Sequence, residues 1–535
     1  MLSVLLKKQL KEFKYSYFTN KKTGKPRSKT EIVLYSILYF FLYCLFVFSI
    51  FAITMGIRIY VDTKETVWIM FAIMSFLTIF GSTFINMLIT RGILFEAKDN
   101  ELMLSLPILD KYIIISRMLN VFLNSLIYTS MLWIPSLIHY FIFYGFDILV
   151  LVYGLLLFIL ITLIVVSLSC LFGYGLSLLM NKFPKKNLLQ TIITLLFLIV
   201  YYVVYFKANS IMTALLANLP KFESAMKTKG ILLYAIAKAA CGDSLYLLVA
   251  LGFTVVICVI CFALILTRYR KLLVSSPKTN KKEFKGYVAK TKPVKQALIN
   301  RELKRFFSNA TYTLNCGLGI VILAAGAIAL IIFSRKIQTF LEAFSFVPQI
   351  KEWVPVILLG VISTILSLDA LSVPAVSLEG KNYWLIRSLP VSTYDVLESK
   401  RELQFRLHVI PLTALSVICT YVFNMEGLVQ VGFVICSITS LLFITYCDLF
   451  LGIKGANLKW NDEIFVIKQS GNVFVAIFGG MIIYVGIPAL YIFLLSKYVS
   501  IQIFLIIMII IFVGVSLLIN YWVKTKGVKL FENLG

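Results

Sequence analysis

One short polar motif that could carry ion-pair and hydrogen-bond chemistry occurs twice in this sequence, the second copy 283 positions after the first (379 minus 96). Between Glu96 and Arg117, seven of 22 positions are identical at that offset, where background usage would give about one or two. The motif residues are Glu96, Lys98, Ser105, Leu106 and Pro107 in the first copy, and Glu379, Lys381, Ser388, Leu389 and Pro390 in the second. Charged groups beside an apolar stripe suit contact with a partner protein, so we interpret each copy as a docking element.

Groups for covalent or metal chemistry are sparse. The sequence has two histidines, His139 and His408, and neither belongs to an H-E-x-x-H pattern. Nine cysteines lack metal-ligand spacing and lie mostly in apolar runs, where free cysteine packs as a small apolar side chain. The sequence also lacks the G-x-x-x-x-G-K-[ST] loop that cradles nucleotide phosphates. We therefore expect no catalytic residues, no metal site, no cofactor in this chain and no enzyme activity of its own.

The composition indicates a lipid-embedded protein. Hydrophobic residues make up 60% of the chain, charged residues 14%, and the mean hydropathy is +0.92. The net charge of +26 is carried by Lys and Arg between the apolar runs, as expected for cytoplasmic loops and contact with anionic lipid head groups. No compact soluble stretch is left for a nucleic-acid groove, so we expect no nucleic-acid partner.

Long apolar runs predict an all-α polytopic protein of about twelve transmembrane helices, arranged as two pseudo-repeated units of six. Basic loops place the N- and C-termini in the cytoplasm, while the loop 207–243 falls outside by parity despite its lysines. The predicted spans are 32–57, 67–90, 113–144, 148–180, 188–206 and 244–267, then 313–334, 352–373, 405–424, 427–452, 473–496 and 500–522.

The predicted domains follow from this pattern. Residues 1–270 form the first unit, 271–295 a basic cytoplasmic linker, and 296–535 the second unit. Residues 4–15 and 296–307 mix apolar and basic side chains at helical spacing, which suits "elbow" helices lying in the membrane interface. We expect the motif copies to form single short helices over 92–107 and 375–390, each ended by its proline.

Polar residues inside the spans are candidates for a substrate pathway. Asp369 lies in the eighth predicted span, and Asn86 is its counterpart in the second. A charge within a span is costly and usually faces a cavity or a partner. Asp369 could line such a cavity or pair with a basic group. We expect Asp448, near a cytoplasmic end, to be hydrated, and the histidines to form interhelical hydrogen bonds.

An elbow helix, two spans, a cytoplasmic coupling helix and four more spans, twice over, resemble the permease unit of ABC transporters of the ABC-2 exporter type. The pattern E-x-K-x-x-x-L-x-x-S-L-P is similar to the loop after the second span in permeases of Gram-positive bacteria. The resemblance implies that the two motif copies enter clefts of a separate ABC ATPase subunit, present as two copies and holding ATP and Mg. It also implies outward transport of a hydrophobic or amphipathic substrate, such as a peptide, drug or lipid, across a bacterial plasma membrane.

A secondary transporter of the major facilitator type is the alternative, because it also has two six-span halves and cytoplasmic ends. That family carries a Gly/Asp/Arg-rich loop after its second span, whereas this chain has Glu96-x-Lys98 and Ser-Leu-Pro there. A separate ATPase partner would distinguish the two. The sequence does not identify the substrate.

Overall fold

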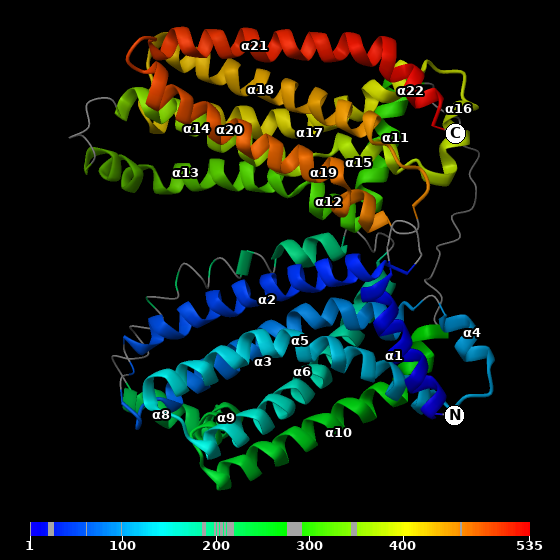
Figure 1. The fold of residues 1–535 in the computed structure, drawn as a ribbon, viewed down its shortest axis with the longest axis vertical. Coiled ribbons are helices and arrows are strands. Elements are labelled where there is room, and N and C mark those ends of the chain that lie inside the picture. The colour runs from blue at the N-terminus through cyan, green and yellow to red at the C-terminus, as the bar shows by residue number, and fades with distance from the viewer. Residues whose placement is uncertain are drawn as a thin grey trace. The chain divides into compact units, whose positions relative to one another are not determined.

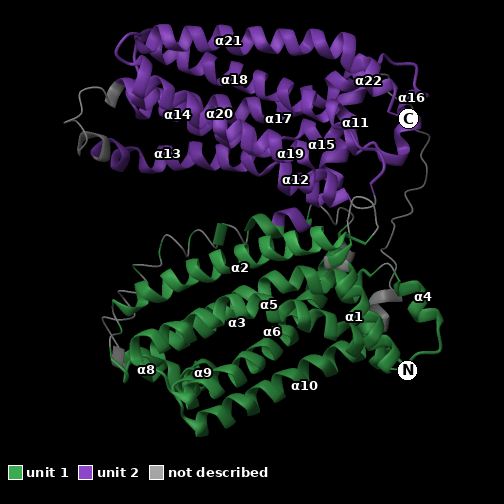
Figure 2. Cartoon of the chain, viewed as in Figure 1, with its two compact units in different colours: residues 1–20, 25–189, 193–283 green, residues 21–24, 190–192, 284–535 purple. Residues whose placement is uncertain are grey.

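The computed structural model describes residues 2–19, 26–59, 61, 63–97, 99–183, 189–196, 199–200, 203, 207, 210, 219–274, 292–343, 350–460 and 463–534. Within these residues the chain is all-helical, without a β-strand beyond one isolated bridge between Thr19 and Pro26 (Figure 1). Contacts divide it into two compact units (Figure 2). Unit 1 contains residues 1–20, 25–189 and 193–283, and unit 2 contains residues 21–24, 190–192 and 284–535.

Eleven helices among the described residues are long and apolar enough to span a membrane, which indicates a multi-pass membrane protein. The predicted span at 188–206 is described only at residues 189–196, 199–200 and 203, so the count of twelve stays a prediction. The helices are Lys29–Arg58, Trp68–Phe95, Asp110–Tyr144, Ile148–Met180 and Ser244–Tyr269 in unit 1, and Leu318–Thr339, Glu352–Ser377, Thr393–Val422, Gly427–Lys454, Gly471–Leu495 and Ile501–Glu532 in unit 2.

In unit 1, α3 (Trp68–Thr90) packs against both α5 (Asp110–Tyr144) and α6 (Ile148–Lys182). A tight turn joins α5 to α6, with Gly145 at a φ of 90° and the Asp147 side chain accepting a hydrogen bond from the Leu149 amide. The other helices are α2 (Lys29–Arg58), which packs on α5, and α10 (Ser244–Val274), which packs on α6. Many side chains on α2 are apolar and exposed, as on a lipid-facing helix.

Two short helices, α8 (Leu219–Thr228) and α9 (Ile231–Ala240), occupy part of the loop 207–243. The alanine-rich face of α9 is buried against α3, α6 and α10. The ring of Trp68, at the start of α3, contacts Phe222 of α8 and Tyr234 of α9. Trp68 is therefore enclosed by protein.

Unit 2 is built around α18 (Gly427–Lys454), which packs against α17 (Thr393–Val422), α21 (Ile501–Trp522) and α14 (Ile350–Asp369). Helix α13 (Leu318–Ala343) lies against α17, and α20 (Gly480–Leu490) lies against α14. Only the short segment Ser496–Ser500 separates the last two candidate spans. Unit 2 therefore has no counterpart of α8 and α9 at this connection.

Helices α1 (Leu2–Phe18) and α11 (Val294–Ser308) occupy the segments predicted as elbow helices. Helix α1 packs on α5 and α11 packs on α17, in each case near the N-terminal end of that long helix. Their position at a membrane surface stays a prediction. Both place charged side chains beside the motif copies, as described below.

The prediction of one continuous helix over 92–107 is wrong. Helix α3 ends in a π-helical turn, Arg91–Phe95, and a separate helix α4 covers Asn100–Ser105. The break has a physical cause, because side chains of Arg117, Tyr269 and Asn100 donate to the carbonyl oxygens of Leu94 and Phe95 that end the first helix. Leu106 then has an extended backbone before Pro107, as the proline predicts.

The segment 375–390 is likewise divided, into α15 (Ser372–Ser377), a 3₁₀ turn (Gly380–Asn382) and α16 (Tyr383–Arg387). The indole nitrogen of Trp460 donates to the carbonyl oxygen of Ser377 at 2.7 Å, which closes α15. Gly380 has a φ of 50°, and a Cβ there would lie 2.8 Å from the Trp460 ring. Only glycine fits this turn without strain.

Candidate docking surface

The apolar side chains of each motif copy are exposed. In α4, Leu102 is 62% exposed, and Leu106 just after the helix is also exposed. Leu385 and Leu389 occupy the corresponding positions at α16 and are exposed too, next to Trp384 at 65%. A spacing of seven and eleven residues predicts one helical face shared by Phe95, Leu102 and Leu106. This prediction is wrong for Phe95, which is buried against the rings of Tyr174 and Tyr269. The part of each motif copy that is exposed for contact with a partner is therefore its second half, which begins at Leu102 or Leu385.

The polar residues of the motif divide into exposed and buried groups. Ser105 and Ser388 are exposed, and their hydroxyls donate to the carbonyl oxygens of Leu102 and Leu385, three residues earlier. Both prolines and Lys381 are exposed. Lys98 lies outside the described residues. Glu379 is the exception, because it is buried.

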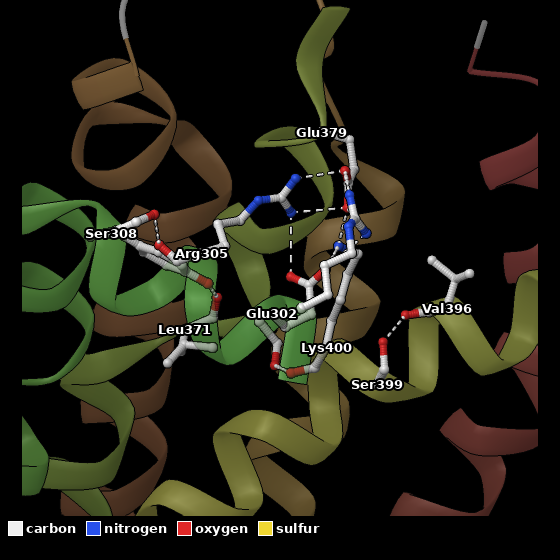
Figure 3. Close-up of polar contacts among 11 residues, drawn as sticks. Glu302, Arg305, Ser308, Leu371, Glu379, Val396, Ser399 and Lys400 are labelled. Carbon is white, nitrogen blue, oxygen red and sulfur yellow. Dashed lines mark hydrogen bonds and ion pairs between the residues drawn. The ribbon is translucent and has the colours of Figure 1, made fainter. Parts of the chain in front are cut away.

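Glu379 lies at the centre of a charged cluster in unit 2 (Figure 3). Its carboxylate accepts from Arg301 at 2.8 Å, Arg305 at 2.6 Å and Lys400 at 2.5 Å. Lys400 also reaches Glu302 at 3.1 Å, and Arg305 reaches it at 3.3 Å. The cluster joins three elements: α11 supplies two arginines and Glu302, α17 supplies Lys400, and the turn before α16 supplies Glu379.

The electrostatics of this cluster favour its charged form. Burial alone would raise the pKa of Glu379, but the charges of Lys400 and Arg305, the hydrogen bond from Arg305 and the charge of Arg301 together hold it well below its ordinary value. Burial lowers the pKa of Arg305, yet its carboxylate partners raise it above the usual value overall. Glu379 and Lys400 each have fully buried side chains, so this ion pair is shielded from solvent, while Arg301 and Arg305 are partly exposed.

Unit 1 has a related but smaller cluster. The buried guanidinium of Arg117, on α5, donates to Asp99 at 2.8 Å and to the Tyr269 hydroxyl at 3.0 Å. Lys8, on α1, also contacts Asp99, at 2.5 Å. Burial opposes ionisation of Asp99, but its hydrogen bond with Lys8 and the charges of Arg117 and Lys8 lower the pKa overall.

The two clusters therefore use different motif positions. Glu96 corresponds to Glu379 in sequence, but its side chain is 44% exposed and pairs with Arg91 at 2.5 Å. Asp99 makes the contacts that Glu379 makes in unit 2, with one cation from the short N-terminal helix and one from the following long helix. Sequence reasoning selected Glu96 and missed Asp99.

Several other cluster residues were not among the predicted site residues. These are Lys8, Arg117, Arg301, Glu302, Arg305 and Lys400. One signal was present: Ser116-Arg117 and Ser399-Lys400 are the last matching pairs of the repeated pattern. A basic residue at the same place in both copies indicates a shared partner for the carboxylates before it.

The predicted substrate-pathway residues are engaged inside the protein. Asp369 is buried at the end of α14, where its carboxylate accepts from the backbone amides of Gly319 and Ile320 at 2.7 and 3.1 Å and contacts His408 at 2.6 Å. It therefore caps the start of α13 and pairs with α17. Asn86 is fully buried, and its amide nitrogen donates to the Ser82 carbonyl oxygen at 2.8 Å.

The interhelical roles expected for the histidines are present. His408 joins α17 to α14 through Asp369, and His139 contacts the Thr54 hydroxyl of α2 at 3.0 Å. The expectation that Asp448 is hydrated is wrong, because the residue is buried and accepts from Gln404 at 2.7 Å. Across the described residues, no group of three or more His, Cys, Asp or Glu side chains has metal-binding geometry.

Comparisons with known proteins found no relative: no family model, no curated protein and no solved structure matches this chain.

Proposed function

We propose that this chain is the membrane-spanning permease subunit of an ATP-binding cassette exporter of the ABC-2 type. The observation that carries the proposal is the pairing, in each unit, of an exposed apolar tip with a charged anchor. Leu102 and Leu385 are exposed at equivalent positions, while Arg117 and Lys400 are buried behind them. A partner that closes on such a tip would displace an element tied by ion pairs to two other helices.

The proposed energy source is a separate ATPase subunit, which would bring ATP and Mg. Two tips in one chain correspond to two ATPase copies. In unit 2, the contacts of Glu379 with α11 and α17 give a continuous polar link from the tip to the helices. In unit 1, Asp99 provides this link to α1 and α5. The short helices α1 and α11 would lie at the cytoplasmic face of a bacterial plasma membrane, with both termini on that side.

The proposed cargo is hydrophobic or amphipathic, because the described spans are apolar and leave little charge to stabilise a strongly hydrated ion. The direction, outward, follows from the family resemblance. No residue of this chain would perform chemistry on the cargo, and ATP hydrolysis would occur entirely on the partner.

Site-specific photo-crosslinking in native membranes tests the docking. A photoreactive phenylalanine analogue at Leu102 or Leu385 is expected to capture a protein whose peptides include a G-x-x-x-x-G-K-[ST] loop. Leu428 is the control, since it is an exposed leucine in the first turn of α18, at the opposite end of unit 2. Failure at both tips, or equal capture at Leu428, would refute the proposal.

The buried pair of Asp369 and His408 favours a second candidate, a proton-coupled secondary transporter, because such pairs recur in membrane proton pathways. The backbone amides on both oxygens of Asp369 argue for a structural role instead. Transport that stops with a protonophore while ATP is maintained would support this candidate, and transport that stops only on ATP depletion would exclude it.

A further inference from the structure

A cavity of about 230 Å³ lies inside unit 2, between α14, α18 and the segment formed by the π-helical turn Val475–Gly479 and α20. By comparison, a cavity that holds one water needs a volume of only ~10–15 Å³, whereas sites for drug-sized ligands have volumes of ~300–1,000 Å³. Most of the lining is apolar, including Phe443 and Ile444. Val475 and Ile483 also line the cavity and are exposed, so it opens at the surface of the unit.

Two of the buried polar residues that line this mainly apolar space, Asp448 and Tyr484, have hydrogen-bonding capacity left over. Asp448 is 4% exposed, and the structure gives its carboxyl group one hydrogen bond, from the neutral amide of Gln404 to Oδ2. Within the described part of the chain, no basic side chain forms an ion pair with Asp448. The Tyr484 hydroxyl is buried and has no hydrogen-bond partner. A buried polar group without a partner costs about 1–3 kcal/mol, so a ligand that supplies partners gains that stabilisation.

The backbone keeps this cavity open. Gly480 packs so closely on α14 that a Cβ would lie 2.7 Å from Cβ of Ser367, which holds the two helices together at that point. At the neighbouring Gly479, a Cβ would meet nothing within 4 Å, although Gly479 lines the cavity. The π-helical turn that ends at Gly479 widens the helix there, and such turns are frequent at functional sites.

We infer that this cavity binds one end of an amphiphile that carries an amine or ammonium group on an apolar chain. The amine would donate to the free oxygen of Asp448 and to the Tyr484 hydroxyl oxygen. The apolar chain would lie along Phe443 and leave through the opening beside Val475 and Ile483. An ammonium group would stabilise the ionised form of the buried Asp448 carboxyl group, whereas a carboxylate or phosphate would oppose it. The cavity lies wholly within unit 2, so this inference does not depend on ATPase docking.

The test is equilibrium binding of radiolabelled dodecylamine to the purified full chain in nanodiscs made of uncharged lipid. Saturable binding of about one dodecylamine per chain is expected, above the partitioning seen in empty nanodiscs. Dodecanoic acid has the same chain with opposite charge, and dodecanol has none. We expect the acid not to compete and the alcohol to compete at least tenfold more weakly.

Four variants, one of them a control, locate the site. Asp448→Asn should weaken dodecylamine binding at least tenfold, and Gly479→Leu should abolish it by filling the cavity. Gly486→Leu is the matched control, because Gly486 lies on the same helix in open space and does not line the cavity. Tyr484→Phe is a second polar variant, which can be measured if Asp448→Asn does not fold. An unchanged melting temperature shows that each protein is folded.

The outcomes are distinct. Absence of saturable dodecylamine binding overturns the inference, as does equal binding of dodecanoic acid. Unchanged binding in both Asp448→Asn and Gly479→Leu also overturns it. None of these results touches the crosslinking prediction at the motif tips, which uses different residues and a different readout.

Discussion

Glu96 and Glu379 occupy equivalent positions in the two motif copies but have different surroundings. The same substitution at each should therefore change the melting temperature by different amounts. Glu379→Gln removes the negative charge that faces Arg301, Arg305 and Lys400 at 2.8, 2.6 and 2.5 Å. Only Glu302 then remains to balance the three cations. Glu96→Gln removes one exposed ion pair.

The magnitudes follow from burial. Breaking a buried ion pair by removing one partner costs about 3–5 kcal/mol, because it leaves uncompensated charge. An exposed pair contributes about 0–1 kcal/mol. For a unit of about 250 residues, each kcal/mol shifts the melting temperature by roughly 2–4 °C. We therefore expect Glu379→Gln to lower the melting temperature by about 6–20 °C, and Glu96→Gln by no more than about 4 °C.

The assay is thermal unfolding of the purified chain in detergent, followed by size-exclusion chromatography of the remaining folded protein. The pH dependence gives a second check. The lowered pKa of Glu379 means that its contribution is fully present above the ordinary carboxyl value of 4.5 and is lost as the pH falls toward the folded-state value. The difference between wild type and Glu379→Gln should thus be constant at pH 6–8 and shrink below about pH 4.5. Equal shifts for the two variants would refute the reasoning.

Three further predictions concern the other anchors and the tips. Asp99→Asn should destabilise unit 1 by about 1–3 kcal/mol, measured as the same thermal shift, because Arg117 stays buried without its carboxylate; a shift no larger than that of Glu96→Gln would contradict the role given to Asp99. Asp369→Asn should lower the free energy of unfolding by about 1–3 kcal/mol, because the two carboxylate oxygens accept from three donors and the variant keeps only one of these oxygens. Slower amide hydrogen exchange at the start of α13 would contradict the capping role. Leu385→Asp should leave the melting temperature unchanged, because the side chain is exposed, but reduce ATPase capture by a photoreactive residue at the neighbouring Leu389 at least tenfold; undiminished capture would count against docking through Leu385.

The apolar helices were predictable because length and hydropathy are properties of local sequence. The predicted span 67–90 corresponds to Trp68–Phe95, and 427–452 corresponds to Gly427–Lys454. Helix ends near prolines were also accessible, since the extended backbone of Leu106 before Pro107 reflects a local steric rule. Such features need no knowledge of distant contacts.

The anchors could not be read in the same way. Whether Glu96 or Asp99 meets Arg117 depends on where α3 ends, and that end is set by side chains from α5 and α10 that donate to its last carbonyl oxygens. The stripe of Phe95 with Leu102 failed for the same reason, since a broken helix has no single face. Burial of Asp448 escaped notice because its partner, Gln404, lies 44 residues away in sequence.

The carboxylate of Asp369 also limits how unit 2 can deform. It touches the first turn of α13, ends α14 and meets His408 of α17, so lengthwise sliding of any of these three helices would break a buried hydrogen bond. The last two spans are held by separate hydrogen bonds, from Tyr394 of α17 to Asn520 and from Asn472 to the Gly455 carbonyl oxygen, and π-helical turns at Val475–Gly479 and Tyr491–Leu495 interrupt the regular bonding of one of them. Rearrangement within the unit should therefore begin where the helical winding is already loosened, with the three linked helices moving as a group.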